Sequence, residues 1–273
     1  MRRFAPSIFM WVLFEVIAVV LWQTQGNVFY LFNFSYIGTC IALGLALFAL
    51  RWRHARRFVQ FAVGLYMLVG LGFIGRENMQ IEGFWYYLAL GVFEGATIHY
   101  LIAKIAGPAL FGRGWCGYAC WTAMVLDLLP WKRSSGRRKG LGAIRYVVLA
   151  GSIMLVAALM ALGLANDELM FWGLIIGNAV YYVLGIAMAA GFRDNRAFCK
   201  YFCPIGILMK PGAYVSLARI KFDPEACIGC HACERACPMD VDMRSNARNR
   251  TNGTECILCT ECITACPKGA LKL

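Results

Sequence analysis

The chain has 273 residues, of which 60% are hydrophobic and only 15% are charged. A soluble globular protein is closer to half apolar and a quarter charged, so this composition excludes an ordinary soluble domain and indicates a membrane protein. The formal net charge of +12 lies in residues 1–220, because residues 221–273 hold seven Lys or Arg and seven Asp or Glu. A nucleic-acid-binding protein would gather its positive charge on a soluble domain, so we expect no DNA or RNA partner.

Six apolar runs follow one another along the first 220 residues. They lie at about 7–22, 28–50, 58–74, 84–110, 146–165 and 170–192. About 20 residues of helix cross a bilayer core, so each run predicts a transmembrane helix. The expected fold class over residues 1–220 is therefore an all-α polytopic membrane domain with about six transmembrane helices. No small-residue cleavage site follows the first run, so we expect it to be an uncleaved anchor.

The segments between these runs alternate in charge. Arg and Lys are frequent before the first run and at 51–57, 104–145 and 193–210, while the other connections are neutral, mixed or acidic. If all the runs cross, every basic segment lies on one side, which the positive-inside rule identifies as the cytoplasm. The sequence therefore predicts a multi-pass protein of the inner (cytoplasmic) membrane, in contact with lipid, with both termini and the C-terminal cysteines inside the cell.

Two cysteine pairs of equal spacing follow the fourth and sixth runs. Cys116 and Cys120 form the first pair, and Cys199 and Cys203 form the second. Residues four apart share one face of a helix, so each pair offers two thiols in one direction. Two such faces opposed would ligate a further iron–sulfur cluster; the alternatives are a redox-active dithiol array and four packed small side chains. Cys40 stands alone in an apolar run and is expected to be a buried small residue.

The C-terminal part carries two cysteine runs of one pattern, C-x2-C-x2-C-x3-C-P. In bacterial two-cluster ferredoxins, the fourth cysteine of each such run ligates the other cluster. We therefore assign two [4Fe-4S] clusters: cluster I with Cys227, Cys230, Cys233 and Cys266, and cluster II with Cys256, Cys259, Cys262 and Cys237. Residues 221–273 are expected to form a small α+β ferredoxin-like domain, held folded by cluster ligation. Within it, residues 239–255 are expected to be a solvent loop that at most docks a redox partner.

These motifs resemble those of a known group of membrane proteins. Paired Cys-x3-Cys motifs with two four-cysteine runs after a helical membrane part are similar to the NapH-type membrane polyferredoxins, the quinol-dehydrogenase components of periplasmic nitrate reductase systems. The methylamine-utilisation membrane ferredoxin and the C-terminal part of the nitrous-oxide reductase regulator NosR are similar as well. The resemblance covers about residues 84–273. It implies electron transfer from membrane quinol, or from a flavin or cytoplasmic donor, toward a partner redox protein such as a reductase, cytochrome or flavoprotein.

Quinol oxidation releases protons, so polar residues inside the apolar runs are candidate catalytic residues. Glu15 and Glu94 lie within predicted helices, where an ionisable side chain is costly and commonly functional. The alternative for each is a neutral side chain that forms a hydrogen bond between helices. His99 lies five residues after Glu94, and it is a candidate for hydrogen bonding to a quinone carbonyl or, alternatively, a packing residue.

Three functional interpretations remain from the sequence. The first is a membrane-bound iron–sulfur protein that passes electrons between the quinone pool, or a membrane-face donor, and a partner redox protein, as the electron-transfer subunit of a quinol-dehydrogenase-type oxidoreductase. The second is a redox assembly or maturation factor that supplies electrons for another metalloprotein. The third, a redox sensor, lacks an output domain in this sequence. No nucleophile–base constellation, phosphate loop or dinucleotide fingerprint indicates substrate chemistry beyond electron flow.

Overall fold

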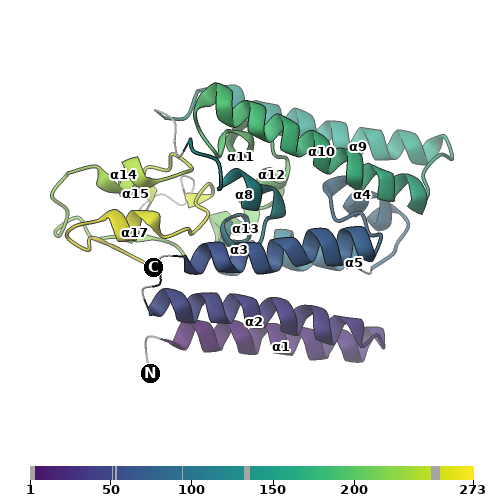
Figure 1. Ribbon diagram of the computed structural model, residues 1–273, viewed down its shortest axis with the longest axis horizontal. Helices are drawn as coiled ribbons and strands as arrows, with labels where there is room; N and C mark the ends of the chain where they lie inside the picture. Colours follow the sequence, from purple (N-terminus) through teal and green to yellow (C-terminus); the bar gives the residue numbers. More distant parts are fainter. Residues whose placement is uncertain (1–3, 51, 53, 94, 132–135, 247–252) are drawn as a thin grey trace.

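The fold is built almost entirely from helices, as the computed structural model shows (Figure 1). The structure describes residues 4–50, 52, 54–93, 95–131, 136–246 and 253–273. Long helices run along one axis, short helices fill the space between them, and a C-terminal lobe (residues 221–273) covers one end.

Five long helices form the body of the molecule within the described residues. They are α1 (Ala5–Gln25), α2 (Phe29–Ala49), α3 (Ala55–Leu65) with its π-helical continuation η2 (Tyr66–Ile74), α9 (Ile144–Ala161) after the 3-10 turn η4 (Leu141–Ala143), and α10 (Asp167–Phe192). Each is long and apolar enough to cross a membrane. Large apolar side chains cover their outer surfaces, among them Val147 and Ile176, which are 71% and 60% exposed. A continuous apolar surface of this kind matches lipid-facing helices.

The fourth apolar run does not form one helix, which corrects the expectation of about six continuous spans. It is divided into α4 (Ile81–Ala89), α5 (Gly95–Tyr100), the π-helix η3 (Leu101–Ala106) and α6 (Pro108–Phe111). Gly91 and Gly95 have φ angles of 72° and 32°, outside the range of a right-handed helix. Glycine reaches such angles because it has no Cβ, and a helix ends where it does so. Hydropathy does not reveal the break, because both halves of the run are apolar.

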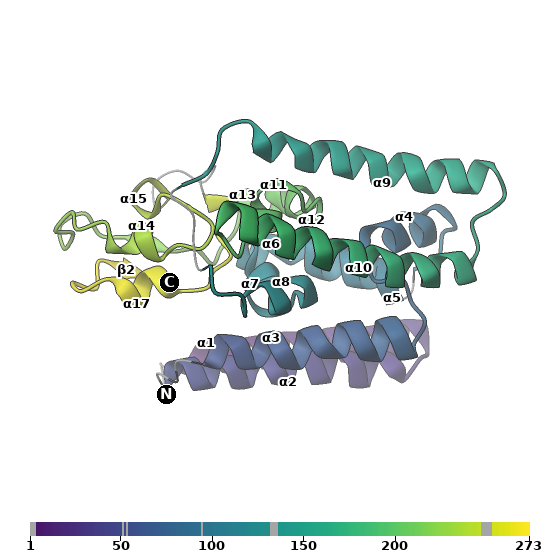
Figure 2. The same ribbon diagram turned by 45° about the horizontal axis from the view of Figure 1, so that its top comes forward.

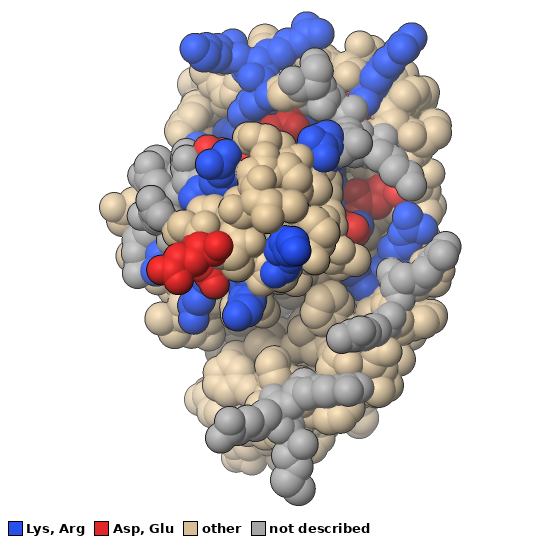
Figure 3. Space-filling model, turned by 90° about the vertical axis from the view of Figure 1, so that its left-hand side faces the viewer, with Lys and Arg blue, Asp and Glu red and all other residues tan. Residues whose placement is uncertain are grey.

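The divided run still carries the chain from one end of the molecule to the other. In Figure 2, α4 and α5 lie far from the C-terminal lobe and α6 lies nearer to it. The start of α1 and the C-terminal residues consequently lie at the same end. The Arg and Lys residues at the start of α3, before α9 and after α10 lie at that end too, and Figure 3 shows basic side chains around the lobe there. The acidic first turn of α10, with Asp167 and Glu168, lies at the opposite end.

The elements are arranged in layers. In the view of Figure 1 the α1–α2 hairpin is the lowest layer, α3 lies above it, and α9 and α10 form the upper layer. Short helices lie between α3 and α10, on the side of the C-terminal lobe: α7 (Gly114–Tyr118), α8 (Trp121–Leu126), α11 (Ala197–Tyr201), α12 (Ile205–Leu208) and α13 (Lys210–Tyr214). These short helices carry the cysteine pairs, so the long helices enclose them.

The C-terminal lobe repeats one backbone shape twice. Strands β1 (Lys221–Phe222) and β2 (Leu271–Lys272) pair antiparallel and close the lobe, and α15 (Met243–Asn246) lies between its halves. Helices α14 (Ala232–Ala236) and α17 (Glu261–Ala265) occupy equivalent positions in the two halves. Residues with a positive φ angle, in the left-handed region, recur at three matching positions of the two halves: Gly229 and Leu258, His231 and Thr260, and Asp240 and Gly269. Such angles are uncommon outside glycine, so their recurrence indicates two tight loops of the same shape.

Candidate metal centres

The two cysteine pairs of the helical part meet at one buried cavity. Cys116 lies on α7 and Cys120 begins α8, while Cys199 lies on α11 and Cys203 follows it. All four line the same cavity. The fold thus brings together the residues that share one spacing in the sequence.

A buried arginine precedes each pair at the same position. Arg113 and Arg196 are the N-cap residues of α7 and α11, and each is 1% exposed. Each forms an ion pair with one carboxylate, Glu255 for Arg113 and Asp127 for Arg196. Arg196 Nη1 also donates to the carbonyl oxygen of Cys116 at 3.1 Å, which joins the two halves. Each half of the cavity therefore has a cysteine pair, an arginine and a carboxylate.

Asp127 fixes Arg196 against the cavity. Its carboxylate accepts hydrogen bonds from Arg196 Nε, Arg196 Nη2 and Arg56 Nη1, each at 2.7 Å. Burial opposes ionisation of this group, but Arg196 and Arg56 outweigh it and lower the pKa of Asp127 to about 2. The carboxylate is therefore charged at any physiological pH, and charge-assisted bonds of this length hold the guanidinium in one orientation.

The cavity has the kind of lining that an iron–sulfur cluster requires. Among the residues that the structure describes, no three His, Cys, Asp or Glu side chains converge as ligands of one ion would. A cluster with several irons instead needs thiolates that stand around a cavity, as these four cysteines do. Arg113, Arg196 and Lys104 line the same cavity. Their positive charges offset buried thiolates, which would otherwise be strongly unfavourable.

The eight cysteines of the lobe lie in two groups. The first group, which lines one cavity, is Cys227, Cys230, Cys233 and Cys266. The second group is Cys237, Cys256, Cys259 and Cys262. Burial raises the pKa of the Cys262 thiol, and the three other thiols of its group lie near enough to raise it further. Each group takes three cysteines from one run and the fourth from the other run.

Backbone N–H groups point at the sulfur atoms of the crossing cysteines. The N–H of Val241 donates to Cys237 Sγ at 3.4 Å, and the N–H of Ala270 donates to Cys266 Sγ at 3.3 Å. The donor follows its cysteine by four residues in both runs. Hydrogen bonds to sulfur stabilise the thiolate form and help to set cluster potentials. The lobe therefore offers two groups of four thiols, each with a backbone donor at its crossing cysteine.

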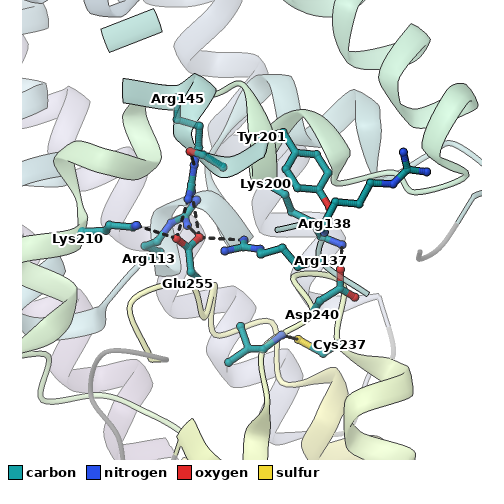
Figure 4. Close-up of polar contacts among 12 residues, drawn as sticks. Arg113, Arg137, Arg138, Arg145, Lys200, Tyr201, Lys210, Cys237, Asp240 and Glu255 are labelled. Atoms are coloured by element: carbon teal, nitrogen blue, oxygen red, sulfur yellow. Dashed lines mark hydrogen bonds and ion pairs between the residues drawn. The ribbon is translucent and has the colours of Figure 1, made fainter. Parts of the chain in front are cut away.

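Glu255 attaches the lobe to the helical part (Figure 4). Its carboxylate contacts four basic side chains, namely Arg113, Arg137 at 3.1 Å, Arg145 at 3.0 Å and Lys210 at 3.3 Å. Burial opposes ionisation, but Arg113, Arg145 and Arg137 hold the pKa of the Glu255 carboxyl well below its usual range. Because Glu255 directly precedes Cys256, the second cysteine group is held against the helices.

The expectation of a mere solvent loop at residues 239–255 is wrong for Glu255, which is only 8% exposed. The three arginines that contact it come from 110 to 142 residues earlier in the chain. A local pattern in the sequence could not indicate them.

A second ion-pair contact lies beside the first. Lys200 Nζ is 2.6 Å from Asp194 and 2.5 Å from Asp240, and its side chain is fully buried (Figure 4). Lys200 directly follows Cys199, and Asp240 lies three residues after Cys237. One side chain thus joins a cysteine segment of the helical part to a cysteine segment of the lobe.

The backbones of the two parts also approach closely at Gly117. A Cβ atom on this residue would lie 2.4 Å from the carbonyl oxygen of Ile257, so only glycine fits. Beside it, Tyr118 Oη donates to the carbonyl oxygen of Leu258 at 3.1 Å. Gly117 directly follows Cys116, and Ile257 directly follows Cys256. The cysteine cavity and the second cysteine group of the lobe therefore meet at this contact.

The candidate proton-handling residues lie in different surroundings. Glu15 on α1 accepts a hydrogen bond from Ser35 Oγ on α2 at 2.7 Å, the interhelical arrangement that was its alternative interpretation. Glu94 lies outside the described residues. His99 on α5 is buried and lines an apolar cavity with Trp115. Cys40 is buried on α2, as predicted.

Sequence reasoning did not single out three residues that the fold places at the site, Lys104, Trp115 and Asp127. Lys104 meets the criterion that makes Glu15 and Glu94 candidates, because it too is an ionisable side chain within an apolar run. Trp115 and Asp127 carried no signal beyond their proximity to a cysteine pair.

Two family profiles match the chain, and together they cover both sets of cysteines. A 4Fe-4S binding domain matches residues 99–140 and 171–222, which include the four cysteines of the helical part. A 4Fe-4S dicluster domain matches residues 219–267, which include the eight cysteines of the lobe.

Curated relatives extend the match over most of the chain. The methylamine utilization ferredoxin-type protein MauN of Methylobacillus flagellatus is 27% identical over 228 residues, covering 72% of this chain and 79% of that protein. The putative electron transport protein YccM of Escherichia coli is 29% identical over 92 residues, covering 34% of this chain and 25% of that protein. The uncharacterized protein MJ0749 of Methanocaldococcus jannaschii is 30% identical over 206 residues, covering 71% of this chain and 77% of that protein. No solved structure matches the chain significantly.

The chain is thus an iron–sulfur electron-transfer protein with 4Fe-4S ferredoxin-type domains and membrane-type helices, and it belongs to the family of MJ0749.

Proposed function

We propose that the protein carries electrons across the surface of the cytoplasmic membrane, between the quinone pool and a partner redox protein. The observation that best supports this path is the contact of Gly117 with Ile257, where the cysteine cavity of the helical part meets the lobe. A path of closely spaced redox centres is what single-electron transfer requires, and no other chemistry is indicated at the site.

The proposal includes three [4Fe-4S] clusters, each of which takes up and releases one electron when bound. The ligands follow the three groups of cysteines. The membrane cluster takes Cys116, Cys120, Cys199 and Cys203; cluster II takes Cys237, Cys256, Cys259 and Cys262; and cluster I takes Cys227, Cys230, Cys233 and Cys266.

The order of the centres follows from the contacts of the protein. Glu255 and Lys200 hold the second cysteine group beside the cysteine cavity, so cluster II is the neighbour of the membrane cluster. The first group lies farther out, and Cys230 is exposed. We therefore infer that the partner protein exchanges electrons at the outer group, and that Arg113, Arg196 and Lys104 stabilise the negative charge of the membrane cluster.

We also propose that the lobe faces the cytoplasm. The support is the gathering of Arg and Lys residues at the end that carries the lobe, as the positive-inside rule requires. A reducing compartment keeps thiolates available as ligands. The partner is a cytoplasmic or membrane-associated reductase, cytochrome or flavoprotein, and a maturation role would use the same path with a different acceptor.

The first test counts iron, acid-labile sulfide and spins in the purified protein. About twelve irons per chain are expected for three clusters, and about eight if only the lobe is metallated. The double variant Cys116→Ser/Cys199→Ser should lose about four irons and keep the EPR signals of the lobe. A wild-type count of about eight would overturn the membrane cluster.

The second test asks whether a quinol is the donor. In membranes, menadiol should reduce the clusters of the wild-type protein as fully as dithionite does, as followed by EPR. If dithionite reduces them and menadiol does not, the quinone pool is not the donor.

A further inference from the structure

An apolar cavity of about 380 Å³ lies between the α1–α2 hairpin and the segment from α5 to α7. Its walls are mainly aliphatic and aromatic side chains, among them Phe14, Phe34 and Ile102. This volume falls in the range of about 300–1,000 Å³ that is typical of small-molecule sites. The cavity shares no lining residue with the cysteine cavity, so it is a separate space.

Two residues of this wall, His99 and Trp115, each carry a polar ring nitrogen. His99 Nε2 and Trp115 Nε1 are buried and have no hydrogen-bond partner within the described residues. The two side chains are 6% and 4% exposed, and their rings meet edge to face with centroids 4.9 Å apart. A buried polar atom without a partner destabilises a fold, so two of them together in one wall indicate a ligand that carries oxygen atoms.

The cavity adjoins the cysteine site through Trp115. This residue directly precedes Cys116, so their Cα atoms are about 3.8 Å apart. Lys104 Nζ, which lines the cysteine cavity, lies 4.5 Å from the centroid of the Trp115 ring. Trp115 therefore lines the first cavity and contacts Lys104 of the cysteine cavity, so a molecule that contacts its indole lies next to a cysteine ligand of the proposed membrane cluster.

An apolar route leads from this cavity to the outer surface. A second cavity of about 240 Å³ shares Phe14 and Trp115 with the first and continues along the α1–α2 hairpin toward the end that carries the lobe, where Leu258 and Leu273 also line it. It is also lined by Phe9 and Phe48, which are 60% and 41% exposed at the surface of the hairpin. A long apolar tail can follow this route out to the bilayer.

We propose that the first cavity binds the headgroup of a prenyl quinone, with His99 Nε2 and Trp115 Nε1 as its hydrogen-bonding partners. A quinone has a flat ring, oxygen atoms at its edge and an apolar tail, which match the walls, the two polar atoms and the exit route in turn. A phospholipid headgroup fits less well, because no Lys or Arg lines the described part of this cavity. The inference rests on the proposed function and names the donor site within it.

Binding of the quinol analogue 2-heptyl-4-hydroxyquinoline N-oxide, measured by quenching of its fluorescence, tests the site in the purified full-length protein. The wild type should bind it saturably. His99→Phe and Trp115→Phe should each weaken binding about tenfold, as the loss of one buried hydrogen bond predicts, and His99→Gln should recover part of the loss. EPR of the dithionite-reduced variants verifies that their clusters are intact.

The matched control is Thr97→Val. Thr97 also lies on α5 and carries a buried oxygen without a partner among the described residues, but it does not line the cavity. This variant should bind the analogue as the wild type does. The site would be overturned if His99→Phe and Trp115→Phe bound the analogue with wild-type affinity, or if Thr97→Val lost as much affinity as they do. The proposed function would still stand in that case if menadiol reduced the clusters. Failure of menadiol with normal analogue binding would remove the quinol donor and leave the site.

Discussion

At the scale of single residues, buried charges decide how the cysteine cavity functions. Arg113 and Arg196 are each held in place by a carboxylate, Glu255 and Asp127 respectively, that other basic side chains share. Lys104, only 5% exposed, lines the same cavity and stands over the Trp115 ring. Because a reduced cluster carries one more negative charge than an oxidised one, a nearby ammonium group favours reduction.

Replacing Lys104 by Met is therefore expected to lower the reduction potential of the membrane cluster. A unit charge close to a buried site changes its energy by on the order of 1–2 kcal/mol at an effective dielectric constant of about 20, or roughly 50–90 mV for one electron. Redox titration followed by EPR measures the shift. Arg76→Met is the control, since Arg76 is exposed at the opposite end of the molecule. An unchanged or raised potential in Lys104→Met would contradict the electrostatic role.

Glu255→Gln is expected to destabilise the attachment of the lobe. The change leaves the buried Arg113 and Arg145 facing a neutral amide, and loss of one partner of a buried ion pair costs about 3–5 kcal/mol. Thermal unfolding and limited proteolysis of the lobe measure the effect, which should appear as a lower midpoint and faster cleavage.

Glu261→Gln is the matched control for that experiment. Glu261 precedes Cys262 just as Glu255 precedes Cys256, but it is 51% exposed and 3.9 Å from its partner Arg56. An exposed pair of this kind contributes about 0–1 kcal/mol. Equal effects of the two substitutions would show that proximity to a cysteine, rather than the buried ion pairs, causes the loss of stability.

At the scale of elements, the sequence was informative where the pattern is local. The spacing of the cysteine runs predicts loops with several thiols in reach of one another, and the lobe has two such loops with matching left-handed residues. The apolar runs predict the long helices because length and hydropathy are enough to identify a span. The break between α4 and α5 was missed, since hydropathy records composition and not the φ angles of Gly91 and Gly95.

The contacts between elements were beyond the reach of local patterns. Glu255 meets arginines more than 100 residues away, and Asp127 meets Arg196 across 69 residues. Nothing in the residues around either carboxylate distinguishes it from a solvated one. The cavity at His99 depends in the same way on Trp115 and on the α1–α2 hairpin, which the sequence places in separate runs.

The contact of α7 with the lobe leads to a prediction about Gly117. A Cβ atom here would overlap the carbonyl oxygen of Ile257 at 2.4 Å, so Gly117→Ala must push the lobe away from Cys116. Gly114→Ala, on the same helix, is the control, because its nearest contact would be an ordinary 3.6 Å. Stopped-flow reduction by menadiol should show slower reduction of the lobe clusters in Gly117→Ala alone. Equal rates in both variants would mean that electrons do not cross at this contact.

At the scale of the whole molecule, the fourth apolar run, which is divided into short helices, explains why both chain ends lie on one side although the number of long helices is odd. Five helices of membrane-spanning length occur in the described residues, and five crossings would place the two ends on opposite sides. The segment from α4 to α6 returns the chain to the end of the lobe as short helices enclosed by longer ones (Figure 2). Irregular backbone at membrane depth is tolerated where protein surrounds it. The cavities that the function needs lie along this segment, so the break and the site have a common structural origin.

This topology predicts where reporters fused to the chain will lie. Green fluorescent protein fused after Leu273 should fluoresce, because the lobe is expected in the cytoplasm, where that reporter folds. Alkaline phosphatase inserted at Gly163, between α9 and α10, should be active, because this connection lies at the opposite end and is expected outside. The reversed pattern would refute the cytoplasmic orientation and keep the arrangement of helices. Both reporters on one side would refute the arrangement itself, because α10 alone separates Gly163 from the end that carries the lobe.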